Sequence, residues 1–266
     1  NAAQAQVSIP GVLGALPAGC NTTSANFANT TPLAVPTGPA VVTSTIVVSG
    51  AAPYLLDLNM TTALAHTFSA DLDVTLTSPA GTVVTVTSDN GAGNDNVFDG
   101  TVWDDSANPA GQVPYVTNNG LVTDHAFVNL TTATPLVPEE AFGAFIGEDP
   151  NGTWTLTISD DLAGDGGNLA SWSLDITTLP SNPIIATVPT ATQATSTAIP
   201  TGPAVVTSTL VVSGAGTAIH DVDMTSFITH SFAADLDITL TSPAGTVVTL
   251  STDNGAGNDN VFNGTV

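Results

Sequence analysis

Residues 36–102 of this chain return almost unchanged as residues 200–266. The two stretches align without a gap at a constant offset of 164, and 48 of their 67 positions are identical. The segment from Pro36 to Thr45, for example, is repeated without a change from Pro200 to Thr209. This period has the length of an ordinary domain and is too long for one unit of a solenoid. The sequence therefore predicts domains in tandem.

Within the first copy, apolar and polar residues alternate with a period of two. The alternation is clearest at Leu72–Leu76, Trp154–Ile158 and Trp172–Ile176, where large apolar residues are separated by Thr, Ser or Asp. Turn-forming sequences such as Ser78–Gly81 and Asp149–Gly152 interrupt these runs. A period of two places one set of side chains inward and the other toward water, so short antiparallel strands are expected. The predicted fold class is all-β, a β-sandwich or jelly roll.

The repeat also sets the predicted domain boundaries. These are an N-terminal extension (1–35), a first sandwich domain (36–178), a Thr/Pro/Ala-rich linker (179–199) and a second, incomplete sandwich domain (200–266). The second copy stops at the position equivalent to Val102, which gives one complete domain plus the first half of another. Because a half-sandwich exposes apolar faces and unpaired strand edges, we expect either a longer tandem array or strands supplied by another chain.

The charge balance restricts the partners of the chain. It has 23 acidic residues and no lysine or arginine, which gives a net charge of −23. Nothing in it can neutralise phosphate groups, so nucleic acids and anionic membrane surfaces are excluded, whereas divalent cations are favoured. No apolar run approaches the roughly 20 residues of a membrane-spanning helix, so no membrane insertion is expected. The one cysteine, Cys20, excludes an intrachain disulfide framework.

A set of motifs rich in Asp, Gly and Trp follows in a fixed order along the first copy. They are Phe68–Thr82, Gly93–Phe98, Thr101–Asp105, Phe145–Leu156, Asp160–Asp165 and Leu169–Leu174. Together they resemble the P domain (Homo B domain), which follows the catalytic domain of subtilisin-like proprotein convertases. The resemblance implies a jelly-roll β-sandwich without catalytic residues. It also implies a role in stabilising an attached protease, or in packing and adhesion in bacterial secreted and surface proteins.

The residues themselves give no candidate for catalysis. The sequence contains neither a Gly-Thr-Ser nucleophile segment nor a His-Glu-x-x-His zinc motif. His66 and His230 are repeat equivalents on presumed strands, where a structural role is expected rather than that of a general base. Adjacent acids such as Asp104 and Asp105 are expected to face water at turns. The chain is therefore predicted not to be an enzyme.

Calcium binding is the one chemical function that the sequence favours. The segment Asn90–Phe98 nearly matches the nonapeptide in which turn carbonyls and an aspartate bind Ca²⁺, although a β-roll needs several such units in tandem. We expect a looser site that gathers acids from neighbouring loops; alternatively, these carboxylates accept hydrogen bonds from loop amides and fix the turns. The candidate ligands are Asp71, Asp73, Asp95, Asp104 and Asp105, with Asp235, Asp237 and Asp259 in the second copy.

The remaining features point outside the cell. Among six Asn-x-Ser/Thr sequons, Asn21 and Asn29 lie in the N-terminal extension and are the predicted glycosylation sites. Tandem copies without a catalytic domain favour an extracellular or cell-surface structural or adhesive protein, a segment or subunit of a fibre or filament. Its partners are then copies of itself, joined head to tail or by strand complementation. The alternative is the C-terminal accessory region of a secreted subtilisin-like or metalloprotease.

Overall fold

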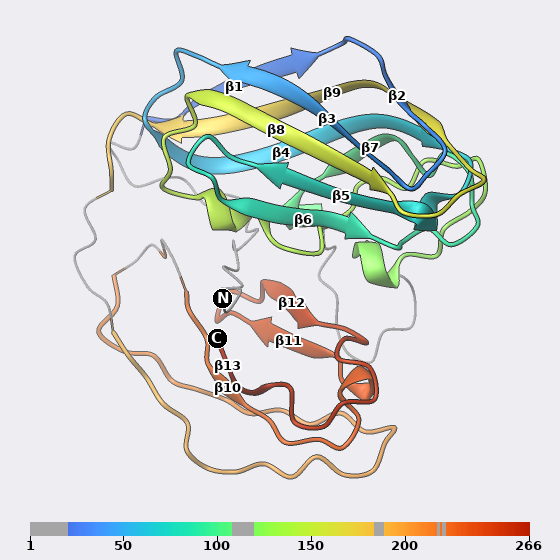
Figure 1. The fold of residues 1–266 in the computed structure, drawn as a ribbon. Helices are drawn as coiled ribbons and strands as arrows, with labels where there is room; N and C mark the ends of the chain where they lie inside the picture. Colours follow the sequence, from blue (N-terminus) through green and yellow to red (C-terminus); the bar gives the residue numbers. More distant parts are fainter. Residues whose placement is uncertain (1–20, 108–119, 184–188, 217–218, 220–221) are drawn as a thin grey trace.

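The computed structural model describes residues 21–107, 120–183, 189–216, 219 and 222–266 (Figure 1). The described residues form strands joined by loops, and their helical segments are 3₁₀ turns of three or four residues. None of the helices in these ranges is long and apolar enough to cross a membrane. The predicted all-β class is confirmed, whereas the jelly-roll connectivity stays a prediction.

Nine strands lie between Thr23 and Leu179 in the described part of the chain. They are β1 (Thr23–Asn29), β2 (Leu33–Val35), β3 (Ala40–Val48), β4 (Tyr54–His66), β5 (Leu72–Thr77), β6 (Val83–Ser88), β7 (Phe98–Trp103), β8 (Gly152–Asp160) and β9 (Gly167–Leu179). The 3₁₀ turns between them are η1 (Ser69–Asp71), η2 (Asp105–Ala107), η3 (Val122–Asp124) and η4 (Phe142–Phe145).

These strands form two antiparallel sheets that pack face to face (Figure 1). One sheet has the order β1-β9-β4-β7, with β2 also paired to β9, and the other has the order β3-β8-β5-β6. Strands β8 and β9 are consecutive in sequence but belong to different sheets. We call residues 152–179 the β8–β9 arch, because this segment places one central strand in each layer of the sandwich.

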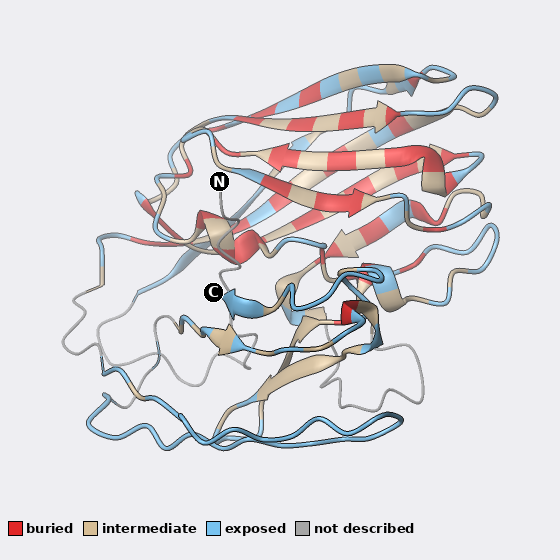
Figure 2. Ribbon diagram, turned by 60° about the horizontal axis from the view of Figure 1, so that its bottom comes forward, coloured by how far each residue is buried: buried red, intermediate tan, exposed pale blue. Residues whose placement is uncertain are grey.

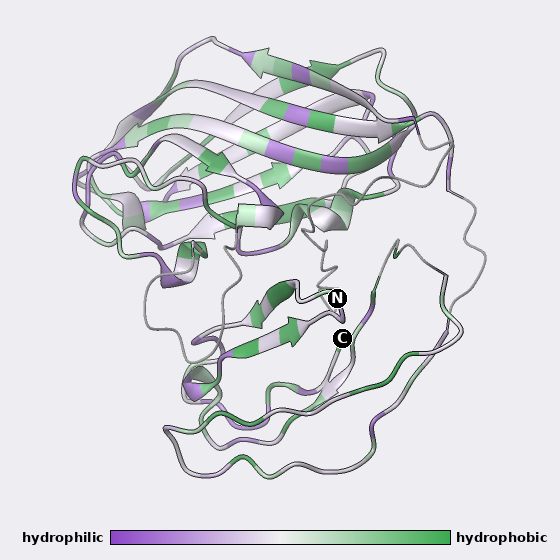
Figure 3. Ribbon diagram, turned by 180° about the vertical axis from the view of Figure 1, so that it is seen from behind, coloured by the Kyte–Doolittle hydropathy of each residue, from purple (hydrophilic) through white to green (hydrophobic). Residues whose placement is uncertain are grey.

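The period-2 pattern is visible directly in the burial of the strands. In β8, Trp154, Leu156 and Ile158 are buried, while the threonines between them are partly exposed (Figure 2). Hydrophobic and hydrophilic residues alternate along the strands in the same way (Figure 3). Burying each large apolar side chain contributes about 1.5–3 kcal/mol, so the inward residues of both sheets supply the stability of the sandwich.

The chain's three tryptophans are all fully buried in this core, and each indole nitrogen has an acceptor. Trp172 on β9 donates to Ser44 Oγ on β3 at 2.8 Å and so links the two sheets. Trp154 donates to the Pro150 carbonyl at 2.9 Å. A buried donor without a partner costs about 1–3 kcal/mol, so these bonds let the core hold large amphipathic rings.

The free edge of β6 is covered by an acidic segment. The backbone amides of Glu139 and Glu140 donate to the carbonyls of Val86 and Thr85, at 3.1 and 3.0 Å. The carboxylates of the same two glutamates accept from the amides of Ser88 and Thr85. Charged groups that cover an edge strand oppose further strand pairing there. The first sandwich is thus closed along this edge.

Residues 23–35, assigned to an N-terminal extension from the repeat boundaries, contribute β1 and β2 to the five-stranded sheet. β1 pairs with β9 along its whole length. In the second copy, the described strands are β10 (Ser226–Phe227), β11 (Ile238–Thr241), β12 (Val247–Ser251) and β13 (Asn263–Thr265), with η5 at Ala233–Asp235. They form two separate two-stranded sheets, β10-β13 and β11-β12.

Candidate functional site

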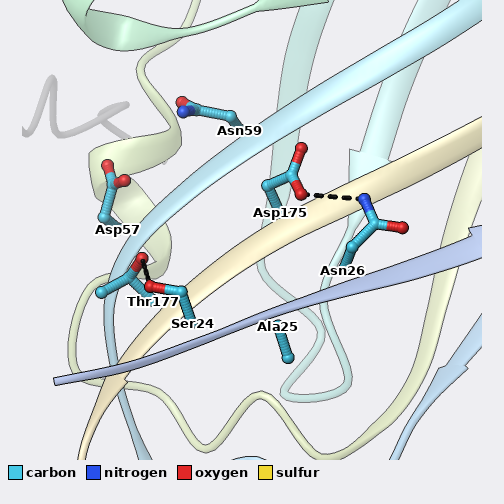
Figure 4. Close-up of a pocket in the computed structure, with 7 residues that line it drawn as sticks. All are labelled: Ser24, Ala25, Asn26, Asp57, Asn59, Asp175 and Thr177. Carbon is cyan, nitrogen blue, oxygen red and sulfur yellow. Dashed lines mark hydrogen bonds between the residues drawn. The ribbon is translucent and has the colours of Figure 1, made fainter.

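A polar pocket of about 270 Å³ opens on the outer face of the five-stranded sheet (Figure 4). Its lining residues come from β1, β4 and β9: Ser24, Ala25, Asn26, Asp57, Asn59, Asp175 and Thr177. Paired residues of β1 and β9 bond across the strands. Asn26 Nδ2 donates to Asp175 Oδ1 at 2.8 Å, and the hydroxyls of Ser24 and Thr177 lie 2.9 Å apart. These side chains largely satisfy one another.

Asp57 of this pocket has two neighbouring carboxylates, Asp104 and Asp105. Asp57 follows an irregularity in the β4–β9 register. Burial raises the pKa of Asp57, and the nearby charge of Asp104 raises it further. Asn59 on β4 is linked to the residue that follows β7, because its side-chain amide donates to Asp104 Oδ1 at 3.1 Å. Asp104 Oδ1 also accepts from the backbone amide of Ser106 at 2.7 Å. Asp105 is the third member of this cluster.

Asp105 connects β7 to the 3₁₀ turn η4. Its two carboxylate oxygens accept from the backbone amides of Phe142 and Gly143, at 2.9 and 2.8 Å. Burial raises the pKa of Asp105 to about 7; the two amides act in the opposite direction, and the charges of Asp104 and Asp57 add to the rise. Asp105 therefore fixes a turn by bonding loop amides, which is the structural alternative expected from the sequence.

Asp57 was not among the residues selected from the sequence, although the repeat carried a signal for it. In the ten positions 51–60, only Ala51, Asp57 and Met60 are identical in the second copy. A charged residue retained in a stretch that otherwise diverges indicates a constrained position. Its counterpart, Asp221, lies outside the described residues.

A second polar group is buried between the sheets. His66 at the end of β4 and Asp160 at the end of β8 are 1% and 0% exposed, and His66 Nε2 lies 3.1 Å from Asp160 Oδ2. His66 Nδ1 lies 2.8 Å from the Phe68 carbonyl oxygen, which fixes the ring. This contact joins the last residues of two strands that belong to different sheets. Neither partner was predicted to meet the other, since they are 94 residues apart.

Two of the predicted calcium ligands lie near this pair. Asp71, at the end of η1, is buried; its pKa is raised by burial and then by the charges of Asp160 and Asp165. Asp73 on β5 is partly exposed, and its pKa is raised by burial and then by the charges of Asp89 and Asp161. Like charges in such proximity are stabilised by a cation or by protonation.

Asp95 lies in the loop before β7. Its backbone amide donates to Asn129 Oδ1 at 2.6 Å, and its carbonyl accepts from the Leu130 amide at 3.0 Å. The backbone of this loop is thereby tied to residues 129–130. The five predicted ligands of the first copy therefore divide into a group around Asp71 and Asp73, a group at Asp104 and Asp105, and Asp95.

In the second copy the equivalent acids are more exposed. Asp237 Oδ1 accepts from Thr252 Oγ1 at 2.6 Å, and Asp235 and Asp259 are exposed. The pKa of the neighbouring Asp253 is raised by burial and then by the charges of Asp237 and Asp235. Within the described ranges, no three His, Cys, Asp or Glu side chains are placed to hold a metal ion together. Calcium binding stays a prediction.

The two predicted glycosylation sites differ in their surroundings. Asn21 is exposed and precedes β1. Asn29 ends β1, and its side-chain amide donates to the Thr45 carbonyl at 2.9 Å and to Ser44 Oγ at 3.1 Å. A glycan at Asn29 requires these bonds to β3 to break, so Asn21 is the more accessible acceptor.

Comparisons with known proteins agree with the architecture. The model of the family "Proprotein convertase P-domain" matches residues 55–176 and 219–264, which is more than half of the chain and includes both copies. No curated protein sequence matches.

Two solved structures from Aeromonas sobria are similar in part. The serine protease matches with a TM-score of 0.33 and 17% identity over 59% of this chain and 27% of its own. The complex of that protease with its chaperone ORF2 matches with a TM-score of 0.35 and 17% identity, over 60% and 28%. The chain thus spans less than a third of the chains that it matches. On the strength of the family match across both copies, this chain belongs to the proprotein convertase P-domain family.

Proposed function

We propose that this chain is an extracellular, non-catalytic association module, in which tandem P domains bind other folded polypeptide instead of transforming a substrate. The observation that carries the proposal is the tandem repeat itself. The family model matches both copies, and the first copy is a closed sandwich of nine strands with a covered edge.

The use we favour for such a module is a structural or adhesive one, as a segment or subunit of a surface filament. Repeated domains that contact one another head to tail associate heterologously, and contacts of this kind extend into filaments when the rotation does not close. The high negative charge favours solubility of the separate chains and makes their association dependent on salt.

The second candidate is an accessory domain that stabilises a secreted protease. The family match favours it, because the family is named after the P domain of proprotein convertases. On this alternative, the closed first copy packs against a catalytic domain, and the chain alone does not assemble.

Light scattering over a wide concentration range, combined with electron microscopy, separates the two uses. Growth of mass with concentration, with filaments in the images, supports the structural role. A compact monomer at every concentration and salt level contradicts it and favours the accessory role. Hydrolysis of chromogenic peptide or ester substrates by the purified chain, lost on unfolding, contradicts the non-catalytic part of the proposal.

A further inference from the structure

The charges of this chain are distributed unevenly along it. All 23 acidic residues lie from Asp57 onward, so the first 56 residues carry no charged side chain. The described part of that stretch forms strands β1, β2 and β3, which lie together along one edge of the sandwich (Figure 1). We call these three strands the neutral edge. On a chain of net charge −23, two molecules repel each other least where their neutral edges meet.

Within the neutral edge, β3 offers a free strand. At the opposite ends of the two sheets, β6 is covered by Glu139 and Glu140, and β7 by Leu136, whose amide donates to the Val102 carbonyl at 2.9 Å. Among the described residues, β3 pairs with β8 on one side and with no strand on the other. Its nine residues include neither a charge nor a proline, the devices with which proteins block a free edge. Such a strand is a template for pairing with another strand.

One hydrogen bond shows which backbone groups of β3 face the free side. Asn29, at the end of β1, donates from Nδ2 to the Thr45 carbonyl at 2.9 Å. The backbone of Thr45 therefore points away from β8. Because alternate residues of a strand present their N–H and C=O groups to the same side, those of Val41, Thr43 and Val47 face the free side as well. The side chains of Val41 and Val47 are 67% and 68% exposed on the outer face.

The sequence of β3 reads nearly the same in both directions. Ala-Val-Val-Thr-Ser-Thr-Ile-Val-Val is centred on Ser44, with a threonine on each side and apolar residues beyond. When two antiparallel β3 strands pair about Ser44, Thr43 lies opposite the partner's Thr45, and Val41 lies opposite the partner's Val47. All four residues present their backbone groups to the free side, so each of these pairs exchanges N–H···O=C bonds. The facing β-branched side chains suit a strand surface and pack on each other.

We propose that two chains of this protein associate through their β3 strands, which pair antiparallel about Ser44 on a two-fold axis. The β3-β8-β5-β6 sheets of the two chains then form one continuous sheet. Asn29 yields the Thr45 carbonyl to the amide of the partner's Thr43. The contact is isologous and closes at two chains, unlike a head-to-tail contact. The inference rests on the proposed association function and names the partner as a second chain of the same sequence.

Disulfide cross-linking of the full chain tests the register. In a Cys20→Ser background, chains with Thr43→Cys are mixed with chains with Thr45→Cys under mild oxidation. The two introduced cysteines lie opposite each other, at the Cα separation of about 5.5 Å that suits a disulfide. Two cysteines at the same position are offset by two residues along the strands and lie beyond the about 7 Å limit, so each variant alone is a control. We expect at least about fivefold more linked dimer in the mixture than in either variant alone.

Sedimentation velocity over a range of concentrations measures the affinity. Thr43→Pro removes an amide on the free side of β3, where proline is compatible with an edge strand. Because symmetry applies the change twice, we expect the dissociation constant of the dimer to rise at least about tenfold. Thr43→Val keeps the amide and a β-branched side chain, so this matched control should stay within about twofold of the unmodified chain. Tryptophan fluorescence checks that the first copy of each variant is folded.

Equal yields of linked dimer in the mixture and in the separate variants overturn the inference, whatever the mass of the chain. A dimer whose dissociation constant does not change with Thr43→Pro also overturns it, and the association function then stands and uses another surface. A chain that is monomeric at every concentration contradicts both. A dimer that responds as expected but forms no filaments supports the inference and contradicts only the filament role.

Discussion

The repeat supplies an internal control for the buried ion pair, because His66 and His230 share their local bonds but only His66 has a carboxylate partner. Changing His66 to alanine leaves Asp160, which is fully buried, without its ion-pair partner. The Oδ1 of Asp160 already has no hydrogen-bond partner. The same change at His230 removes no ion pair in the described structure.

The expected losses follow from this difference. Removing the hydrogen-bond partner of a buried polar group costs about 1–3 kcal/mol, and more where that group is charged, because the group stays unsatisfied in the core. That is a large part of the about 5–15 kcal/mol that stabilises an ordinary domain. For His230→Ala we expect a change in the free energy of unfolding of the first copy below about 0.5 kcal/mol, since the altered site is not part of it.

Urea unfolding followed by tryptophan fluorescence isolates the first copy, since all three tryptophans lie between Trp103 and Trp172. His66→Ala is expected to lower the unfolding midpoint strongly without changing the slope. The double variant with Asp160→Asn should lose less than the sum of the two single changes. A loss below about 1 kcal/mol for His66→Ala, or equal losses for both histidines, refutes the reasoning.

Three further predictions follow from other contacts. Because burial raises the pKa of Asp105 from 3.8 to about 7, the folded chain holds a proton that the unfolded chain releases. Stability should therefore fall as pH rises through that window, and Asp105→Asn should flatten this part of a urea-midpoint profile; an unchanged profile contradicts the assignment. Gly38→Ala should destabilise the first copy by about 1–3 kcal/mol in the fluorescence assay, because the added Cβ would lie 2.4 Å from Asp160 Oδ1. Gly202→Ala should be close to neutral, because the nearest atom to its Cβ position is the amide nitrogen of Ala204 at 3.8 Å, and equal effects of the two changes contradict this difference. If the predicted calcium site exists, EGTA lowers the melting temperature and calorimetry detects binding of millimolar Ca²⁺; no change in either measurement removes it.

The strands of the first copy were predictable because local pattern and tertiary burial agree there. Trp154–Ile158 and Trp172–Ile176 alternate in sequence, and the structure buries the predicted residues of each. The same reasoning does not predict β1, because the residues of β1 are mostly exposed and form no apolar face. This strand is defined by its pairing with β9. Pairing across long sequence separation leaves no local signal.

The second copy shows the limit of sequence pattern most clearly. Ala204–Val212 has the pattern of a strand and forms none, because a strand needs a hydrogen-bonded neighbour that propensity does not describe. The acidic residues show the same limit. The abundance of acidic residues in the sequence favours a cation site. The structure is needed to show that Asp105 accepts hydrogen bonds from loop amides and that Asp160 contacts His66.

Amide hydrogen exchange of the full chain tests the dependence of these segments on a partner most directly. The nearly identical sequences of Ala40–Val48 and Ala204–Val212 make their intrinsic exchange rates almost equal. We predict strong protection in Ala40–Val48 and exchange close to the unstructured rate in Ala204–Val212. Equal protection of the two segments in the monomeric chain contradicts the claim that this sequence forms a strand only where a neighbour such as β8 pairs with it.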